Sequence, residues 1–304
     1  MGPTRLPPRS KTAGTRPRLA RIEVVANVAA GGVGPDAPDE LAKIFAEYGI
    51  KARISTPQVK ELAKCLAGCV ASDPDLLVVL AGDGTARAAA ELCGPKGPMI
   101  APLPGGTMNM LPHAVYGARP WPEALRLALD EGEERLVGGG CVEGHRFLCG
   151  AVLGSPALWA PAREAVRDGE LRLAWRRGKR ALDRTFTGRL RYSINGGPRA
   201  KAEALVLMCP VASAALDEEA QVLEAAALDV HGAGEVLRLG LNALVRNWRD
   251  DPAVETQTCR TAKVWSARSI PALLDGETVR LKAATEIRYE PAVCRLLAPP
   301  KDET

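Results

Sequence analysis

Aromatic residues make up only 4% of this 304-residue chain. Proteins that hold single-stranded nucleic acid commonly stack its bases on aromatic side chains, so no nucleic-acid partner is expected here. The formal net charge of +4 is also too small to indicate nucleic-acid binding. A mildly basic balance is compatible with phosphate ligands or with an anionic membrane surface.

Metal-binding patterns and membrane segments are lacking as well. The chain has three histidines, and its eight cysteines form no C-x-x-C pair, which argues against a zinc site. Scattered cysteines of this kind suit free thiols in a reducing cytoplasm. No apolar run approaches the ~18 residues of a membrane span, and the N-terminal stretch lacks the apolar core of a signal peptide. We therefore expect a cytoplasmic protein without a transmembrane segment, long enough for two domains.

The first part of the chain alternates between strand and helix patterns. Apolar runs at Arg21–Asn27, Ile50–Ser55 and Leu76–Ala81 predict strands. An amphipathic helix is expected at Asp39–Tyr48, and a second helix follows Pro57. This alternation continues to about residue 130 and is typical of a parallel, doubly wound α/β sheet.

Short strand patterns replace this alternation in the second part of the chain. Glycine turns such as Asn195–Gly197 separate several of them, which predicts an antiparallel β domain built as a sandwich. Helical insertions are expected at Pro156–Trp175 and Glu235–Trp248. The strands are predicted at Arg135–Cys141, Arg146–Leu153, Arg189–Asn195, Ala202–Cys209, Gln257–Ala267, Thr278–Lys282 and Glu286–Glu290.

The GDGT segment Gly82–Thr85 lies between the apolar strand Leu76–Ala81 and the alanine-rich Ala86–Glu91. A strand, a glycine turn and a helix leave free N–H groups at the helix start, which favour a phosphate. The glycines also permit positive φ angles and close approach of a ligand. Asp83 would repel phosphate unless Mg²⁺ lies between them or the carboxylate orients or deprotonates a hydroxyl. An ordinary turn capped by Asp83 and Thr85 is the alternative.

A second glycine turn follows the next predicted strand. Pro98–Met110 contains an apolar run, two glycines, Thr107 and Asn109, with a helix expected from there to Tyr116. The carboxyl ends of neighbouring parallel strands face one crevice, where open α/β sheets bind ligands. The G-x-x-x-x-G-K-[ST] motif of P-loop enzymes and the protein-kinase signatures are absent.

GDGT, the later PGGTMN element and the late Asp275-Gly276-Glu277 together resemble the diacylglycerol kinase catalytic domain family. That family includes bacterial lipid kinases, sphingosine kinases and ceramide kinases, and the resemblance spans roughly Arg21 to Leu297. It implies a nucleotide-binding α/β domain at 19–132 and a β-sandwich acceptor domain at 133–298. Tails are expected at 1–18, basic and disordered, and at 299–304.

The resemblance also implies ATP and Mg²⁺ as cofactors and transfer of the γ-phosphoryl group to a lipid hydroxyl, that of diacylglycerol or of a ceramide or sphingoid lipid. Glu277 is expected as the base, Asp275 as its support, and Asp83 as the carboxylate that binds Mg²⁺ or orients the hydroxyl. These three roles remain interchangeable. The residues expected to bind nucleotide are Asn27, Thr56, Gly82, Asp83, Gly84, Thr85, Thr107 and Asn109.

Some segments depart from the family pattern. The loop Ala29–Pro38 resembles an N-P-x-S-G element but lacks its proline and serine. Thr56 matches a nucleotide-contacting threonine, although it equally suits a helix cap. A structural Mg²⁺ loop of the type D-G-x-L-D-V corresponds to Ala225–Val230, which keeps only its last three residues, so this metal is not expected.

Two other functions remain open from the sequence. NAD kinases also carry a GDGT turn, so a soluble small-molecule kinase is the first alternative. A nucleotide- or lipid-binding protein that has lost catalysis is the second. A basic run such as Arg163–Arg191 is commonly a solvated face, and for a lipid kinase it also predicts peripheral contact with the inner face of the membrane. The sequence does not decide between a monomer and a homodimer.

Overall fold

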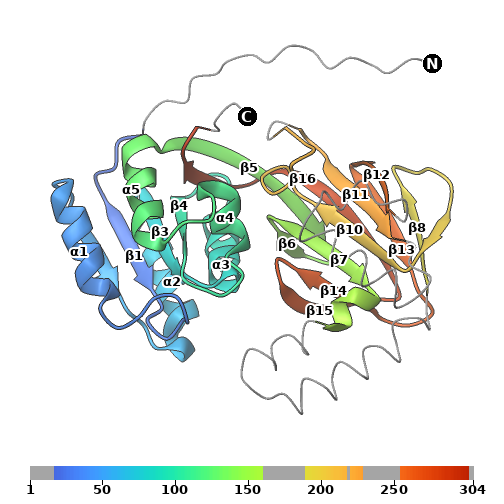
Figure 1. Cartoon of the computed structure of the whole chain (residues 1–304), viewed down its shortest axis with the longest axis horizontal. Helices are drawn as coiled ribbons and strands as arrows, with labels where there is room; N and C mark the ends of the chain where they lie inside the picture. The colour runs from blue at the N-terminus through green and yellow to red at the C-terminus, as the bar shows by residue number, and fades with distance from the viewer. Residues whose placement is uncertain (1–16, 160–188, 218–219, 229–253, 301–304) are drawn as a thin grey trace.

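The computed structural model describes residues 17–159, 189–217, 220–228 and 254–300. An α/β half and a β half lie side by side (Figure 1), which confirms the predicted fold class. The N-terminal tail to residue 16, nearly all of the predicted basic run, and most of both predicted helical insertions lie outside the described residues.

The α/β half is built on a parallel sheet in the order β2-β1-β3-β4. All six residues of β3 are buried, because helices cover both faces of such a sheet. The strands are β1 (Ile22–Ala26), β2 (Ala52–Ser55), β3 (Leu76–Ala81) and β4 (Met99–Pro104). The helices are α1 (Ala37–Glu47), α2 (Leu62–Ala71), α3 (Asp83–Cys93), α4 (Met110–Tyr116) and α5 (Trp121–Glu131), with a 3₁₀ turn η1 (Val59–Glu61) before α2.

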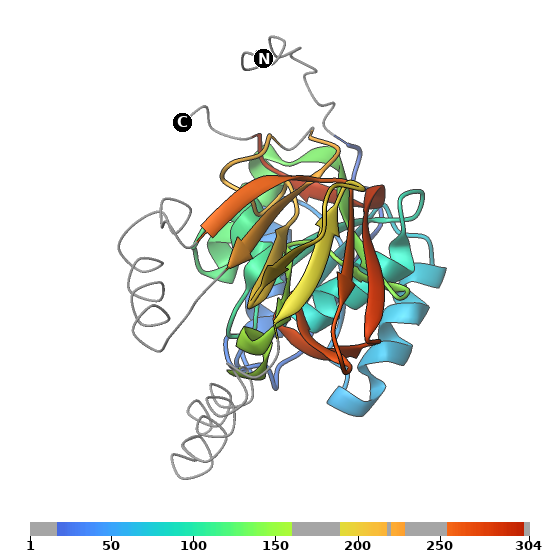
Figure 2. The same ribbon diagram turned by 90° about the vertical axis from the view of Figure 1, so that its right-hand side faces the viewer.

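The β half consists of two stacked layers of antiparallel strands, which Figure 2 shows from the end of the molecule. One layer has the order β12-β11-β10-β7-β14-β15, and the other contains β16-β13-β8-β9 with β5 and β6 attached. The strands are β5 (Glu133–Val142), β6 (His145–Phe147), β7 (Gly150–Gly154), β8 (Leu190–Ile194), β9 (Ala200–Ala202), β10 (Ala204–Met208), β11 (Leu223–Leu228), β12 (Val254–Cys259), β13 (Thr261–Trp265), β14 (Ile270–Leu274), β15 (Glu277–Leu281) and β16 (Ala284–Ala298), and a 3₁₀ turn η2 (Ser155–Trp159) follows β7.

The strand β16 joins the halves into one sheet. The 15-residue strand β16 pairs with β13 and β5 in the β half and runs on to pair in parallel with β4, where Leu296 lies opposite Ile100. The same sheet therefore extends from β2 to β9. A single hydrophobic cluster includes residues from both halves. The domain boundary between residues 132 and 133 stays a prediction.

Two predicted strands of the β half are wrong because each is two strands in different layers. Arg146–Leu153 divides into β6 and β7, and Gln257–Ala267 divides into β12 and β13. The residues on both sides of the first crossing are buried, so no polar turn marks it. The strand β14 was not predicted, and neither was β11, which includes most of the segment compared with a metal loop. Residues 225–228 of β11 are buried and apolar and offer no side-chain metal ligand.

Candidate active site

Glycine residues let the loops after β1, β3 and β4 pack main chain against main chain. The N–H of Gly32 donates to the carbonyl of Gly105 at 3.1 Å, and the N–H of Gly105 donates to the carbonyl of Ala81 at 3.2 Å. A Cβ on Gly106 would lie 2.8 Å from the Cα of Gly82. The sequence analysis did not identify Gly32, Gly105 and Gly106 as parts of this packing. The signal for it was the pair of adjacent glycines in each of the segments AAGGVG and PGGT.

Gly82 and Gly84 do not use the positive φ angles that glycine permits. Gly82 has a φ of −79°, and neither residue is among those with positive φ. Gly84 is needed for the close approach of a side chain from the β half, whereas a Cβ on Gly82 would lie 3.9 Å from the Cα of Gly106, an ordinary contact. The helix α3 starts directly after Gly82, and the N–H groups of Thr85 and Ala86 both donate to the carbonyl of Gly82.

The polar side chains of the loops after β4 and β1 brace their own loops. Asn109 has a φ of 49°, accepts the N–H of Gly106 at 2.7 Å and donates to the carbonyl of Gly106 at 3.0 Å. Asn27 accepts the N–H of Ala29 at 3.2 Å. Thr107 is exposed on the Asn109 loop. These contacts fix the shape of the two loops.

Thr56 follows the last residue of β2, Ser55. Its side chain is exposed just after β2. The helix α2 begins only at Leu62, and Gln58 and Glu61 precede η1 and α2 as cap residues. The predicted capping role of Thr56 is therefore wrong, because the chain passes through a 3₁₀ turn before the α-helix starts.

Asp83 lies in the first turn of α3 and is half-buried. Its Oδ1 accepts the N–H of Leu111, in the first turn of α4, at 3.3 Å. Burial raises the pKa of the Asp83 carboxyl, and the main-chain N–H groups of Leu111, Met110 and Asn109 oppose that shift. The carboxylate thus links the starts of two helices at the edge of the crevice.

Asp275 lies in the turn between β14 and β15, and its carboxylate is used for structure. Asp275 and Gly276 have φ angles of 47° and 85°, the sign that two-residue hairpin turns of the I′ type require. Its side chain is 5% exposed and accepts the N–H groups of Leu148, Cys149 and Gly150 at 2.7, 2.8 and 2.9 Å. Burial raises its pKa, and these N–H groups oppose the shift. Asp275 therefore fixes the hairpin to the break between β6 and β7.

Glu277 begins β15 and reaches from the β half to the first turn of α3. Its carboxylate forms an ion pair with Arg87 of α3 and lies so close to Gly84 that a Cβ there would be 1.9 Å from its Oε1. Glu277 therefore contacts the residue that follows Asp83, which brings carboxylates from both halves to one place. Sequence reasoning missed Arg87, whose only signal was its position one helical turn after Gly84.

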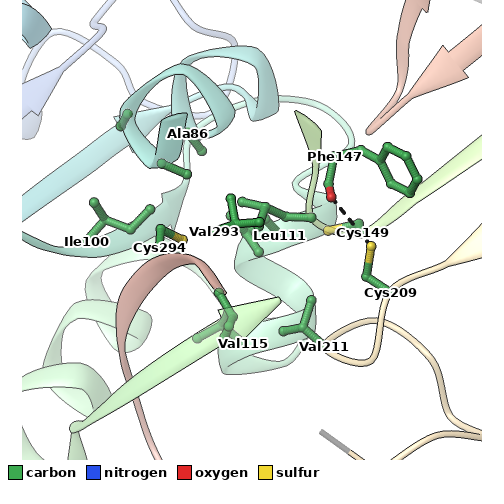
Figure 3. Packing of buried hydrophobic residues seen from close by; sticks show 14 of the residues in the cluster. Ala86, Ile100, Leu111, Val115, Phe147, Cys149, Cys209, Val211, Val293 and Cys294 are labelled. Carbon is green, nitrogen blue, oxygen red and sulfur yellow. Dashed lines mark hydrogen bonds between the residues drawn. The ribbon is translucent and has the colours of Figure 1, made fainter. Parts of the chain in front are cut away.

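The buried core between the α/β half and the β half supports the carboxylates of Asp83 and Asp275. Figure 3 shows Leu111 and Val293 between Cys294 on one side and Cys149 on the other. Leu111 donates its N–H to Asp83, and Cys149 donates its N–H to Asp275. Packing between the halves therefore positions the main-chain N–H groups that bind Asp83 and Asp275.

The cysteines in this core are inert. All eight cysteines of the chain are free thiols. Burial raises the pKa of the Cys149 and Cys209 thiols well above the usual value, so both stay protonated at neutral pH. The Sγ of Cys209 lies 3.5 Å from the carbonyl oxygen of Phe147, as Figure 3 shows. Neither thiol is a candidate nucleophile.

Within the described residues, no group of three or more His, Cys, Asp or Glu side chains is arranged to hold a metal ion. A magnesium ion that enters with a nucleotide needs only one or two protein carboxylates, because phosphates and water complete its shell. Asp83 at the start of α3 fits that requirement. In the same described part of the chain, no helix is both long enough and apolar enough to cross a membrane.

Residues 21–139 match the family model of the diacylglycerol kinase catalytic domain, which confirms the resemblance over this stretch. No curated protein matches the chain. Two solved structures assigned as diacylglycerol kinases of Bacillus anthracis strain Sterne are 15% and 17% identical to it, with TM-scores of 0.72 and 0.71. Each comparison covers 94% of this chain and 99% of the other, and at this identity it shows a shared fold.

Proposed function

Because residues 21–139 match the family model of the diacylglycerol kinase catalytic domain, we propose that the chain is an ATP-dependent lipid kinase. It transfers the γ-phosphoryl group of ATP to a hydroxyl of a membrane lipid. The observation that carries the proposal is the position of Glu277, whose carboxylate from the β half lies against Gly84 at the start of α3. A proton acceptor and a helix start suited to phosphate thus face each other across the two halves.

The start of α3 supplies the phosphate site. The first N–H groups of a helix lack partners within it, and the helix dipole favours negative charge there. Gly82 and Gly84 would contribute N–H groups, and Thr85 would contribute its hydroxyl, because its N–H already donates to the carbonyl of Gly82. The loops of Asn27, Thr107 and Asn109 would bound the same site. Mg²⁺ bound with the nucleotide would take Asp83 as its protein ligand and would offset the charge of the phosphates.

Glu277 acts as the general base. It accepts the proton of the lipid hydroxyl while that oxygen forms a bond to the γ-phosphorus, and the bond from the γ-phosphorus to the leaving oxygen of ADP breaks. Its side chain is 47% exposed, so a substrate can reach it. Asp275 positions it by holding the turn two residues earlier. Its oxygens already accept three N–H groups, which favours the supporting role over that of base.

Diacylglycerol is the first acceptor to test, and a ceramide or sphingoid lipid is the second. The matched family model supports a lipid acceptor over NAD. The contact between Glu277 and Gly84 supports a working enzyme over a binding protein that has lost catalysis. A lipid acceptor also requires that the protein contact a membrane surface during turnover.

Transfer of labelled γ-phosphate from ATP tests the proposal. The acceptors are diacylglycerol, ceramide, sphingosine and undecaprenol in mixed micelles, with NAD in solution. Glu277→Gln should abolish labelling of the lipid, whereas Glu286→Gln, which changes an exposed glutamate on β16, should not. Labelling of NAD alone would identify a soluble kinase. ATP binding without transfer to any acceptor would identify a binding protein.

A further inference from the structure

Arg87 is a charged residue of the crevice to which the transfer chemistry assigns no role. We propose that Arg87 is a positioning residue that holds the Glu277 carboxylate so that Oε1, and not Oε2, receives the proton. The kinetic part of this inference rests on the proposed function. The structural part concerns only where the carboxylate lies.

One guanidinium contacts both ends of the β14–β15 turn. Its Nη2 pairs with Oε2 of Glu277, and its Nη1 lies 3.4 Å from the carbonyl oxygen of Leu274. Leu274 and Glu277 are the last residue of β14 and the first residue of β15, and they pair with each other. Arg87 therefore fastens the hairpin to α3 at the position of the carboxylate.

The two members of the ion pair differ in exposure. The Arg87 side chain is 18% exposed, and the Glu277 side chain is 47% exposed. The arginine is thus the anchored partner on a rigid helix, and the glutamate is the partner with freedom to move. A planar guanidinium can serve two acceptors at fixed angles, which a lysine ammonium on a flexible stem does less well.

The second oxygen of the carboxylate is placed by the same contact. Arg87 and Gly84 are three residues apart and share one face of α3. While Oε2 is taken by the guanidinium, Oε1 lies over Gly84, where a Cβ would be 1.9 Å away. Oε1 consequently points at the helix start, where we place the phosphates and the acceptor hydroxyl.

The chain offers a matched control for this ion pair. Arg126 of α5 pairs with Glu47 of α1, and both side chains are about as exposed as Glu277, at 40% and 41%. This pair joins two helices of the α/β half and touches no residue of the crevice described above. Arg126→Gln removes the same kind of contact without disturbing the proposed base.

Steady-state kinetics of lipid phosphorylation tests the role in catalysis. Arg87→Gln should lower kcat by about 10²-fold, the effect of misplacing a reacting group by about 1 Å, while the KM for ATP changes by less than about twofold. Arg87→Lys should recover part of the loss, and Arg126→Gln should match the wild type. An unchanged kcat in Arg87→Gln would overturn the inference.

A crystal structure of Arg87→Gln decides the structural part whatever the acceptor is. The carboxylate of Glu277 should leave Gly84, and a carboxylate that remains over Gly84 would overturn the inference. Failure of the wild-type protein to phosphorylate any acceptor would refute the proposed function alone. The two proposals therefore fail by different observations.

Discussion

One added methyl group at Gly84 should separate catalysis from folding. A Cβ at this position would lie 1.9 Å from Oε1 of Glu277, whereas real Cβ contacts below 3.0 Å essentially do not occur. The carboxylate must therefore move by at least about 1.1 Å in Gly84→Ala. Misplacing a catalytic group by about 1 Å costs about 10²-fold in rate, or about 2.7 kcal/mol of transition-state stabilisation.

The same change should leave the fold intact. Gly84 does not have a positive φ, so alanine can adopt its backbone conformation. The atom that alanine displaces is the tip of a flexible side chain that is 47% exposed. Alanine is more favourable than glycine in a helix by up to about 1 kcal/mol. We expect the free energy of unfolding to stay unchanged or to rise by up to that amount.

Thermal unfolding, monitored by circular dichroism, measures the effect on stability. Transfer of labelled phosphate measures the effect on the rate. Gly68→Ala is the matched control, because Gly68 lies in the helix α2 and a Cβ there would meet nothing within 4 Å. It should raise stability and leave the rate unchanged. A Gly84→Ala variant with full activity would refute the placement of Glu277 as base. A variant that lost both stability and activity would refute the idea that only the carboxylate moves.

Three further changes test the supports of the crevice. Gly106→Ala places a Cβ 2.8 Å from the main chain of Gly82 and should lower the free energy of unfolding by about 1–3 kcal/mol. The control Gly31→Ala, where a Cβ meets nothing within 4 Å, should change it little. Equal denaturation midpoints for the two variants would refute the close packing. Burial raises the pKa of Asp275 in the folded state above the usual value for an aspartic acid, so the carboxyl stabilises the fold fully below that usual value and loses this contribution as the pH rises through the folded pKa. The stability of the wild type relative to Asp275→Asn should therefore fall over that window, and a rise with pH in urea titrations would contradict the sign. Tyr116→Phe removes a buried hydrogen bond to a β16 carbonyl and should cost about 1–3 kcal/mol in stability without changing kcat.

The α/β half could be predicted because each element carries its own signal. The strand Leu76–Ala81 is a continuous apolar run, and its predicted bounds agree with the structure. Glycine and proline mark the turns around it. The buried sheet and its covering helices impose these patterns locally, so reading along the sequence was sufficient to recover them.

The β half was harder because its layers are set by distant contacts. The chain changes layer at Leu148 and Cys149, where both residues are buried and no turn residue appears. The N–H groups freed at this break are taken by Asp275, more than a hundred residues later. A pattern read along the sequence cannot show a turn whose hydrogen bonds lie in another hairpin.

The candidate site, too, could be predicted from the sequence only in part. The GDGT and DGE motifs could be found because each is a compact sequence signal. The two motifs do not show where they touch. The contact between Glu277 and Gly84, and the ion pair between Glu277 and Arg87, could not be located from the sequence. The sequence shows that Gly82 and Gly84 permit positive φ angles, but their actual φ angles depend on the loops packed against them. The close approach of a ligand to these glycines stays a prediction.

The parallel pairing of β16 with β4 has a consequence for synthesis of the chain. Ile100 and Leu296 come from the first and last thirds of the sequence. Until β16 has left the ribosome, β4 presents an open strand edge, and such edges promote pairing with other chains. The α/β half thus cannot complete its sheet by itself during translation. A nascent chain that stalls before β16 is expected to aggregate or to need a chaperone at that edge.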